Sequence, residues 1–326
     1  MRAAVCRSYG PPEAVRVEDL PAPTMGAGEV RLRVVAAAIN FPDVLLVADE
    51  YQVSAPTPFV PGSELAGVVA EVGDEVHGFA VGDLAIGTAL VGAFAEQAVV
   101  GADALRRIPP GVAMHVAAAF GVAHRTAYHV LRSVARVQPG EELVVLGAGG
   151  GVGLAAVQLG TVLGATVTAV ASSPEKLEVA SSHGAVHLID HRRVDLRQAL
   201  RECLPSGADV VVDPVGGDLA EPALRALRWG GRFVTVGYAS GVIPKIPLNL
   251  VLLKGVQVLG FQFRDFALHE EGEYRRNEDE LMDLLASGRA VPHIGARFPL
   301  DDVVAAMRFV AEGRAIGKVV LDVAVV

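Results

Sequence analysis

The residues of this chain with the clearest chemical meaning are six small ones, Ala148-Gly149-Gly150-Gly151-Val152-Gly153. They follow a short β-branched run, "ELVVLG", and open a helix-like run, "GVGLAAVQLGTVLG". In this context they match the pattern G-x-G-x-x-G, with Ala148 in place of the first glycine. Gly150 would let the backbone approach a pyrophosphate, and Gly153 would let helix and strand pack closely. Because the start of a helix attracts phosphate, we predict a dinucleotide site that includes Gly150, Gly151, Val152 and Gly153.

A second set of polar residues follows the next strand-like run, "ATVTAVAS". A protein that binds NAD places Asp or Glu about 20 residues after the glycines, to bind the ribose 2′-hydroxyl. This chain has Ala171-Ser172-Ser173 there instead. Two hydroxyls and the nearby Lys176 can hold a 2′-phosphate, so we predict NADPH, bound by Ser172, Ser173 and Lys176. The alternative is that Ser173 only caps a helix beginning at Pro174 and that Lys176 is a surface lysine, but capping and binding are compatible.

Strands and helices must position these residues, and residues 143–174 supply them without a single Asp, Glu, Lys, Arg or His. An uncharged run of that length would permit a membrane span. Its seven glycines, and the order strand, glycine turn, helix, strand, favour instead a βαβ unit that is buried on both faces. We therefore predict an α/β fold with a doubly wound parallel sheet and no membrane segment.

Size and composition set wider limits on the class of protein. The 326 residues fit two domains of about 100–200 residues each, and the net charge of −9 disfavours a nucleic-acid or anionic-membrane surface. Two cysteines, Cys6 and Cys203, are too few for a disulfide framework or a four-thiolate zinc site. The N-terminal run "MRAAVCRSYG" has no apolar segment of the kind that signal peptides carry. We expect a cytoplasmic protein that binds neither nucleic acid nor membranes.

The first part of the chain has the pattern of a β domain. Residues 1–125 alternate apolar and polar types between turn signals, and "GEVRLRVVAAAIN" is typical of a strand. Glycines at 62, 67, 73, 78, 82 and 87 then separate short β-branched runs, with turn signals at Gly73-Asp74 and Gly82-Asp83. This part is predicted to be compact and mostly antiparallel.

Several segments, in order, resemble the medium-chain dehydrogenase/reductase superfamily: "NFPDVLL", "PGSELAGVVAEVGDEVHGFAVGD" and "DPVGGDLAEPALRALRWGGRFVTVGYASG". The resemblance runs from "AAAIN" to "GRAIGKVVL" and is closest to the zinc-independent NADPH:quinone oxidoreductase branch, the relatives of ζ-crystallin. It implies a GroES-like, β-rich catalytic domain over 1–125 and 264–326 and a Rossmann domain over 126–263.

The same resemblance bears on metal binding. Zinc alcohol dehydrogenases of this superfamily carry Cys where this chain has Asn40, and Gly-His-Glu where it has Gly62-Ser63-Glu64. Zinc needs three or four converging nitrogen, sulfur or oxygen ligands. The closest helical pair of histidines, His124 and His129, fits packing better than ligation. We expect no metal site.

Residue roles are also implied by the resemblance. Asn40, Asp43 and Tyr51 take catalytic positions: an amide that donates to the developing oxyanion or the cofactor, a carboxylate that orients its loop or the ribose, and a hydroxyl at the acceptor. Each has a plainer alternative, as a turn former, a helix cap and a packing residue. Further contacts to the cofactor are implied for Thr126, His191, Gly237, Tyr238 and Lys318.

The expected absence of zinc limits the class of reaction that the protein can catalyse. Without a Lewis acid to stabilise an alkoxide, oxidation of a simple alcohol is hard, whereas a quinone or an α,β-unsaturated ketone delocalises the charge of an arriving hydride. We predict NADPH-dependent reduction of quinones or other activated carbonyl or alkene acceptors. The alternatives are an enoyl-thioester, enone or alkenal reductase and a non-catalytic NADPH-binding protein. The apolar, β-rich run "PLNLVLLKGVQVLGF" is expected to extend the sheet across a homodimer.

Overall fold

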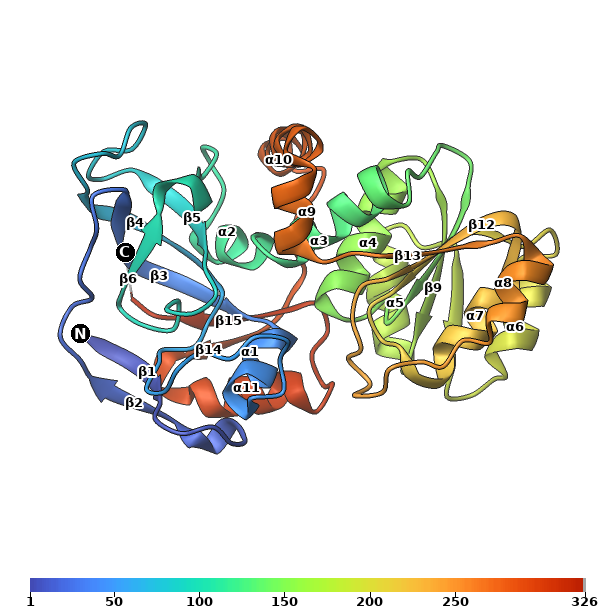
Figure 1. Cartoon of the computed structure of the whole chain (residues 1–326), viewed down its shortest axis with the longest axis horizontal. Helices are drawn as coiled ribbons and strands as arrows, with labels where there is room; N and C mark the ends of the chain where they lie inside the picture. Colours follow the sequence, from blue (N-terminus) through green and yellow to red (C-terminus); the bar gives the residue numbers. More distant parts are fainter. Residues whose placement is uncertain (325–326) are drawn as a thin grey trace. The chain divides into compact units, whose positions relative to one another are not determined.

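The computed structural model describes residues 1–324, which form two compact units (Figure 1). The first consists of Met1–Val122 and the chain from Val291 onward, and the second of Ala123–Ala290. Residues 264–290, expected in the first domain, thus belong to the second unit. This segment forms α9 (Phe263–His269) and α10 (Glu271–Ala286). Buried hydrogen bonds join α10 to α3 (Ala123–His129), and aromatic rings of α9 pack against His129 of α3.

The first unit is built around a seven-stranded, mostly antiparallel sheet with the order β14-β15-β3-β4-β5-β7, in which β6 also pairs with β3. Its strands are β3 (Glu29–Ile39), β4 (Glu64–Val72), β5 (Leu84–Thr88), β6 (Gln97–Gly101), β7 (Leu105–Arg107), β14 (Ile294–Pro299) and β15 (Lys318–Asp322). A two-stranded ribbon of β1 (Arg2–Cys6) and β2 (Val15–Asp19) accompanies it. The helices are α1 (Phe41–Ala48), α2 (Met114–Phe120) and α11 (Val303–Ala311).

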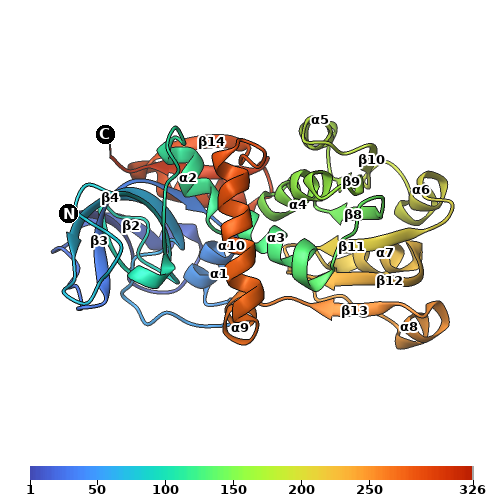
Figure 2. The ribbon, with the colours of Figure 1, turned by 90° about the horizontal axis from the view of Figure 1, so that it is seen from above.

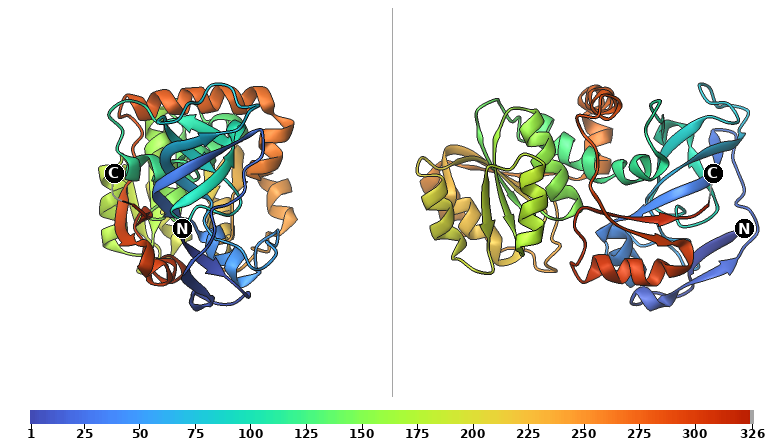
Figure 3. Two further views of the ribbon diagram at one scale, coloured as in Figure 1. Left: turned by 90° about the vertical axis from the view of Figure 1, so that its left-hand side faces the viewer. Right: turned by 180° about the vertical axis from the view of Figure 1, so that it is seen from behind.

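The core of this unit joins buried side chains of the strands to those of two helices. Leu32, Leu65 and Phe94 meet in one buried cluster with Leu46 of α1 and Met307 of α11. Figure 3 shows α1 and α11 together beside the strands of this unit. The long central strand β3 therefore delivers Asn40, the residue that follows it, to the start of α1.

The second unit has a six-stranded, wholly parallel sheet with the order β10-β9-β8-β11-β12-β13. Its strands are β8 (Glu142–Leu146), β9 (Thr166–Ala171), β10 (His187–Asp190), β11 (Ala208–Asp213), β12 (Leu227–Thr235) and β13 (Gln257–Gly260). Helices α4 (Gly151–Val162) and α5 (Pro174–Ser182) lie on one face, and α6 (Leu196–Cys203) and α7 (Ala220–Ala226) on the other (Figure 1). α8 (Leu248–Lys254) precedes the edge strand β13 (Figure 2).

The uncharged run that begins the second unit has the predicted form: β8, glycine turn, α4, β9. All side chains of β11 are buried, as a sheet covered on both faces requires. No helix in the described part of the chain is both long and apolar enough to traverse a bilayer.

One prediction for this unit is wrong in part. The run "PLNLVLL", expected to be β-rich, forms α8, and only the following residues form β13. Pro247 at the N-cap and Gly255 in a left-handed conformation (φ 58°) at the C-cap delimit the helix. Local capping outweighed the β propensity of the segment.

Candidate functional site

Two glycines of the turn in the second unit differ in how much space surrounds them. A Cβ atom on Gly153 would lie 2.1 Å from the backbone oxygen of Gly147, so only glycine lets α4 pack against the end of β8. A Cβ atom on Gly150 would find its nearest neighbour 3.5 Å away, again the Gly147 oxygen. Gly150 is therefore not required by the packing of the unit itself. It is the N-cap of α4, where Gly151 and Val152 present backbone N–H groups that have no partner within the helix.

Positive charge gathers beside this turn. The side chain of Lys176 lies over Gly149, since a Cβ atom on that glycine would come within 2.6 Å of Lys176 Cβ. Lys176 Nζ is 3.4 Å from Ser172 Oγ, and Ser173 caps α5 by accepting a hydrogen bond from the Lys176 backbone N–H, as predicted. Burial, and then the Arg192 guanidinium, lower the pKa of Lys176. A cation in such surroundings is stabilised by an anion.

The adjacent parallel strand brings His191 to the same edge of the sheet. Its backbone N–H donates to Ala171 O at 3.1 Å, so the ends of β9 and β10 lie side by side. Burial, followed by Arg192, lowers the pKa of the His191 imidazole. The structure thus brings His191, a cofactor contact implied by the resemblance, to the group of Ser172, Ser173 and Lys176 that the sequence predicts.

The loops after β11 and β12 also converge. Asp213 ends β11, and its Oδ1 accepts the backbone N–H groups of Val215 and Gly216, each at 2.8 Å, so it shapes the turn. Gly216 has φ 69°, and a Cβ atom there would lie 2.9 Å from the ring of Tyr238. Gly237 and Tyr238 therefore sit beside this turn, at the carboxyl ends of parallel strands, where ligands of open α/β sheets bind. Thr126 lies in α3 and is half-buried.

The first unit holds a buried polar cluster at the end of β3. Lys318 Nζ donates to Glu64 Oε1 at 2.5 Å and to Asn40 Oδ1 at 2.6 Å. Asn40 Nδ2 donates in turn to Glu64 Oε1 at 2.8 Å and to Ser63 Oγ at 3.2 Å. Lys318, expected at the cofactor, is only 3% exposed and is part of this cluster. The two amide hydrogens of Asn40, expected to serve an oxyanion, are both engaged within the unit.

Asp43 closes the cluster from α1. Its Oδ2 accepts the Asn40 backbone N–H at 2.7 Å in a capping box. Burial raises the pKa of Asp43 to about 7, although that hydrogen bond, Ser63 and the Lys318 charge each lower it. The aromatic ring of Tyr51 packs against the core of this unit, and burial, then the Asp43 charge, raise the pKa of Tyr51.

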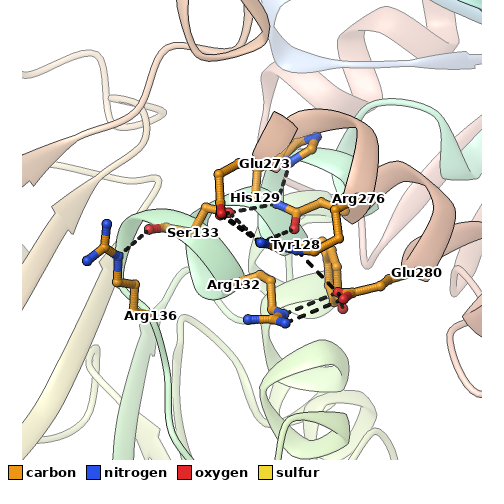
Figure 4. Close-up of polar contacts among 9 residues, drawn as sticks. Tyr128, His129, Arg132, Ser133, Arg136, Glu273, Arg276 and Glu280 are labelled. Atoms are coloured by element: carbon orange, nitrogen blue, oxygen red, sulfur yellow. Dashed lines mark hydrogen bonds and ion pairs between the residues drawn. The ribbon is translucent and has the colours of Figure 1, made fainter. Parts of the chain in front are cut away.

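A second buried network, which the sequence did not reveal, joins α3 to α10 in the second unit. Figure 4 shows neighbouring polar contacts, among them those of Tyr128 and His129 with α10. Glu278 Oε1 accepts from Arg125 Nε at 2.9 Å and from His129 Nε2 at 3.1 Å. The Asn277 amide donates to His129 Nδ1 at 3.0 Å, which places the imidazole proton on Nε2. The Arg125 guanidinium lies 4.9 Å from the ring centre of Phe263. His129 thus has a packing and hydrogen-bonding role.

Metal ligation fits the described residues poorly. Within residues 1–324, no three His, Cys, Asp or Glu side chains are grouped as metal ligands would be. At the position expected from zinc relatives, residues 40, 63 and 64 offer an amide, a hydroxyl and a carboxylate. The Lys318 ammonium already donates to the Asn40 and Glu64 oxygens. A bound cation would face that positive charge.

Known proteins resemble the chain over its whole length. The family "Alcohol dehydrogenase GroES-like domain" matches residues 26–110, and "Zinc-binding dehydrogenase" matches 151–287. The "Quinone oxidoreductase-like protein 2 homolog" of Nematostella vectensis is 35% identical, over 98% of this chain and 88% of its own.

Two solved structures share the fold. The quinone oxidoreductase of Escherichia coli, complexed with NADPH, has a TM-score of 0.91 at 27% identity and covers 99% of this chain and 100% of its own. The quinone oxidoreductase of Thermus thermophilus has a TM-score of 0.86 at 33% identity, and the match covers 99% of this chain and 100% of its own. Together with the GroES-like unit and the parallel-sheet unit, these matches show that the chain belongs to the quinone oxidoreductase family of the medium-chain dehydrogenase/reductase superfamily.

Proposed function

We propose that this protein is an NADPH-dependent oxidoreductase that transfers hydride to quinones or other activated carbonyl or alkene acceptors without zinc. The observation that carries the proposal is the group of Ser172, Ser173 and Lys176 beside the glycine turn. It replaces the acidic residue that would favour NADH, and its cation suits a 2′-phosphate. Relatives of known structure, including the Escherichia coli protein, are complexes with NADPH.

The residues present fit this cofactor. Gly150 leaves room for a pyrophosphate at the start of α4, with the N–H groups of Gly151 and Val152 as donors. Gly237 and Tyr238, beside the turn at Asp213, suit the nicotinamide half, together with Thr126. When bound, NADPH supplies a hydride at C4 of the nicotinamide ring.

Zinc-independence rests on the cluster at Asn40. A metal there would have to displace the Lys318 ammonium from Glu64 and Asn40, and it would find neither a thiolate nor an imidazole. The Lys318 ammonium is paired with the Glu64 carboxylate and fixes the orientation of the Asn40 amide, which offers a polar surface to an acceptor oxygen. Tyr51, in the same unit, carries a hydroxyl group that could hydrogen-bond the acceptor.

The test is an acceptor screen with NADPH and NADH. Quinones, enones, alkenals and enoyl-CoA thioesters are compared by kcat/KM, with metal analysis of the purified protein. We expect NADPH to be preferred, turnover of quinones or enones, and less than stoichiometric zinc. Preference for enoyl-CoA would favour an enoyl-thioester reductase, and NADPH binding without any turnover would favour a non-catalytic protein. Preference for NADH, or stoichiometric zinc, would contradict the proposal.

A homodimer is proposed from the exposed edge of the parallel sheet. β13 pairs only with β12 among the described strands. The preceding helix α8 exposes Leu248, Leu252 and Leu253, which are 79%, 78% and 70% exposed. Trp229, on β12, is 77% exposed. Large apolar side chains beside an open strand edge favour pairing with a second copy about a two-fold axis.

A further inference from the structure

The end of β10 carries a group that can change its charge near neutral pH. His191 directly follows this strand, and its backbone N–H donates to Ala171 O at 3.1 Å. The register of the two strands pairs Asp190 with Ala171, so His191 comes opposite Ser172, about 5 Å away on the adjacent strand end. Histidine is the side chain whose ordinary pKa lies between pH 5 and 8. The group proposed to hold the 2′-phosphate therefore adjoins a residue that can be neutral or cationic.

Two further basic side chains lie at this edge of the sheet. Lys176, in the first turn of α5, places Nζ 3.4 Å from Ser172 Oγ. Arg192 directly follows His191 and is exposed, and the structure shows no ion pair for it within residues 1–324. Burial, then the Arg192 charge, lower the pKa of His191, and the Lys176 charge adds to this effect. In the protein without cofactor, the imidazole is therefore neutral near pH 7.

The carboxylates around His191 have partners of their own. Asp190, whose charge raises the pKa of His191, pairs with Arg193 at 3.2 Å. Asp195 caps α6, which also packs against β10. Glu175, in the first turn of α5, is exposed and lies within the influence of the Arg193 charge, and β9 carries no charged side chain. Among the described residues, each carboxylate near the imidazole thus already has a cation or a helix start beside it.

We propose that His191 is a specificity-determining residue that binds the 2′-phosphate as an imidazolium, so that the preference for NADPH over NADH increases as the pH falls. In this step one proton passes from the solvent to the imidazole when NADPH binds, and no other bond changes. The inference rests on the proposed NADPH-dependent function and deepens it, because it makes the choice of cofactor depend on pH. All the residues involved belong to the second unit.

The sign of the effect follows from the charge of the ligand. A phosphate monoester carries close to two negative charges above its second pKa of about 6. Such an anion raises the pKa of His191, whereas burial and the basic neighbours lower it in the protein without cofactor. Between these two pKa values, NADPH binding weakens by up to about 10-fold for each unit of pH, because one proton is bound together with the cofactor. NADH has a hydroxyl at the same position and should bind with constant affinity.

The decisive measurement is the Kd of NADPH and of NADH between pH 6.5 and 8.5. In the wild type we expect the ratio of the Kd for NADH to that for NADPH to fall at least about 5-fold over this range, and in His191→Gln to stay constant. His187→Gln removes another imidazole of β10, about 13 Å earlier along the strand, and should behave as the wild type does. Lys176→Arg keeps a cation that does not titrate, so it should retain the pH dependence.

Calorimetry gives a readout that does not depend on turnover. Titration with NADPH at pH 7.5, in two buffers of different ionisation enthalpy, yields the number of protons taken up on binding. We expect uptake of up to about one proton per site in the wild type, and uptake near zero with NADH or in His191→Gln. A preference for NADPH that is constant with pH, or that varies equally in His191→Gln, would overturn the inference and leave the proposed function standing. A wild type that prefers NADH at every pH would overturn both.

Discussion

Lys318 and Glu64 form a buried ion pair, with Nζ and Oε1 2.5 Å apart and the two side chains 4% and 0% exposed. Glu64 comes from the start of β4 and Lys318 from the start of β15, so the pair connects two strands that flank β3. Asn40, at the end of β3, hydrogen-bonds both partners. The pair therefore sets the orientation of the amide that contacts Ser63.

Removing one partner of this pair should be more harmful than removing both. Lys318→Met leaves the Glu64 carboxylate buried without its cation, and we expect a loss of about 3–5 kcal/mol in the free energy of unfolding. The double variant Lys318→Met with Glu64→Gln should recover part of that loss. Urea unfolding of the two variants and the wild type measures this. A Lys318→Met variant as stable as the wild type would show that the pair does not hold the cluster.

Lys176→Ala should change cofactor preference. Loss of a charged contact to the 2′-phosphate is expected to raise the Kd for NADPH by about 10–100-fold and to leave the Kd for NADH nearly unchanged. Arg201→Ala removes an exposed charge from α6 in the same unit and serves as the matched control. Fluorescence titration with both cofactors gives the ratio. Equal effects on NADPH and NADH would place Lys176 away from the 2′-phosphate.

Substituting alanine for two glycines of the turn should affect different properties, folding stability in one case and cofactor binding in the other. Gly153→Ala would force a Cβ atom to within 2.1 Å of the Gly147 oxygen, so we expect a loss of stability of several kcal/mol, about 3 or more. Gly150→Ala, whose Cβ would have its nearest neighbour 3.5 Å away, should fold normally but bind NADPH at least about 10-fold more weakly. Thermal unfolding and cofactor titration separate the two effects. Tight NADPH binding by a stable Gly150→Ala protein would argue against a pyrophosphate there.

Asp43 should make the stability of the first unit depend on pH. The folded state keeps the Asp43 proton up to about pH 7, whereas the unfolded chain loses it near 3.8, so this group's contribution to stability declines between those values. In Asp43→Asn the decline should be absent. The difference in the free energy of unfolding between variant and wild type should thus shift in favour of the variant by up to about 4 kcal/mol from pH 4 to 8. A constant difference across this range would mean that the buried carboxyl is ionised throughout.

Leu252→Glu should disrupt the proposed homodimer. The side chain is 78% exposed on α8, so a single folded chain should tolerate glutamate, whereas an apolar contact between two copies should not. Light scattering coupled to size exclusion should show a dimeric wild type and a monomeric variant with unchanged circular dichroism. Val81→Glu, at an apolar position 69% exposed in the first unit, should leave the dimer intact. A monomeric wild type would contradict the proposal.

Much of the second unit could be predicted from sequence because its signals are local. The uncharged run, the glycine spacing and the Ser173-Pro174 cap each act over a few residues, and the structure confirms the strand-turn-helix-strand order and the cap. The sequence of segment 248–254 does not distinguish a strand from a helix, because its apolar, branched residues suit both. Pro247 and Gly255 at its ends decided the outcome.

The polar networks could not be predicted because they depend on distant parts of the chain. Lys318 reaches Asn40 across 278 positions, and Glu278 reaches His129 across 149. In the sequence, Lys318 suggested a cofactor contact and His129 a packing residue, since nothing near either of them reveals a partner. The same limit hid the contact of Ser63 with Asn40, since 23 positions separate them in the sequence.

The cation at the end of β3 is a lysine side chain. A charge encoded in the chain is present as soon as folding is complete, without a metallation step. In the proposed zinc-independent enzyme, chelators would leave this cation in place and scarcity of zinc would not reduce the fraction of functional molecules. Its position is as reproducible as the pairing of β3 with β15.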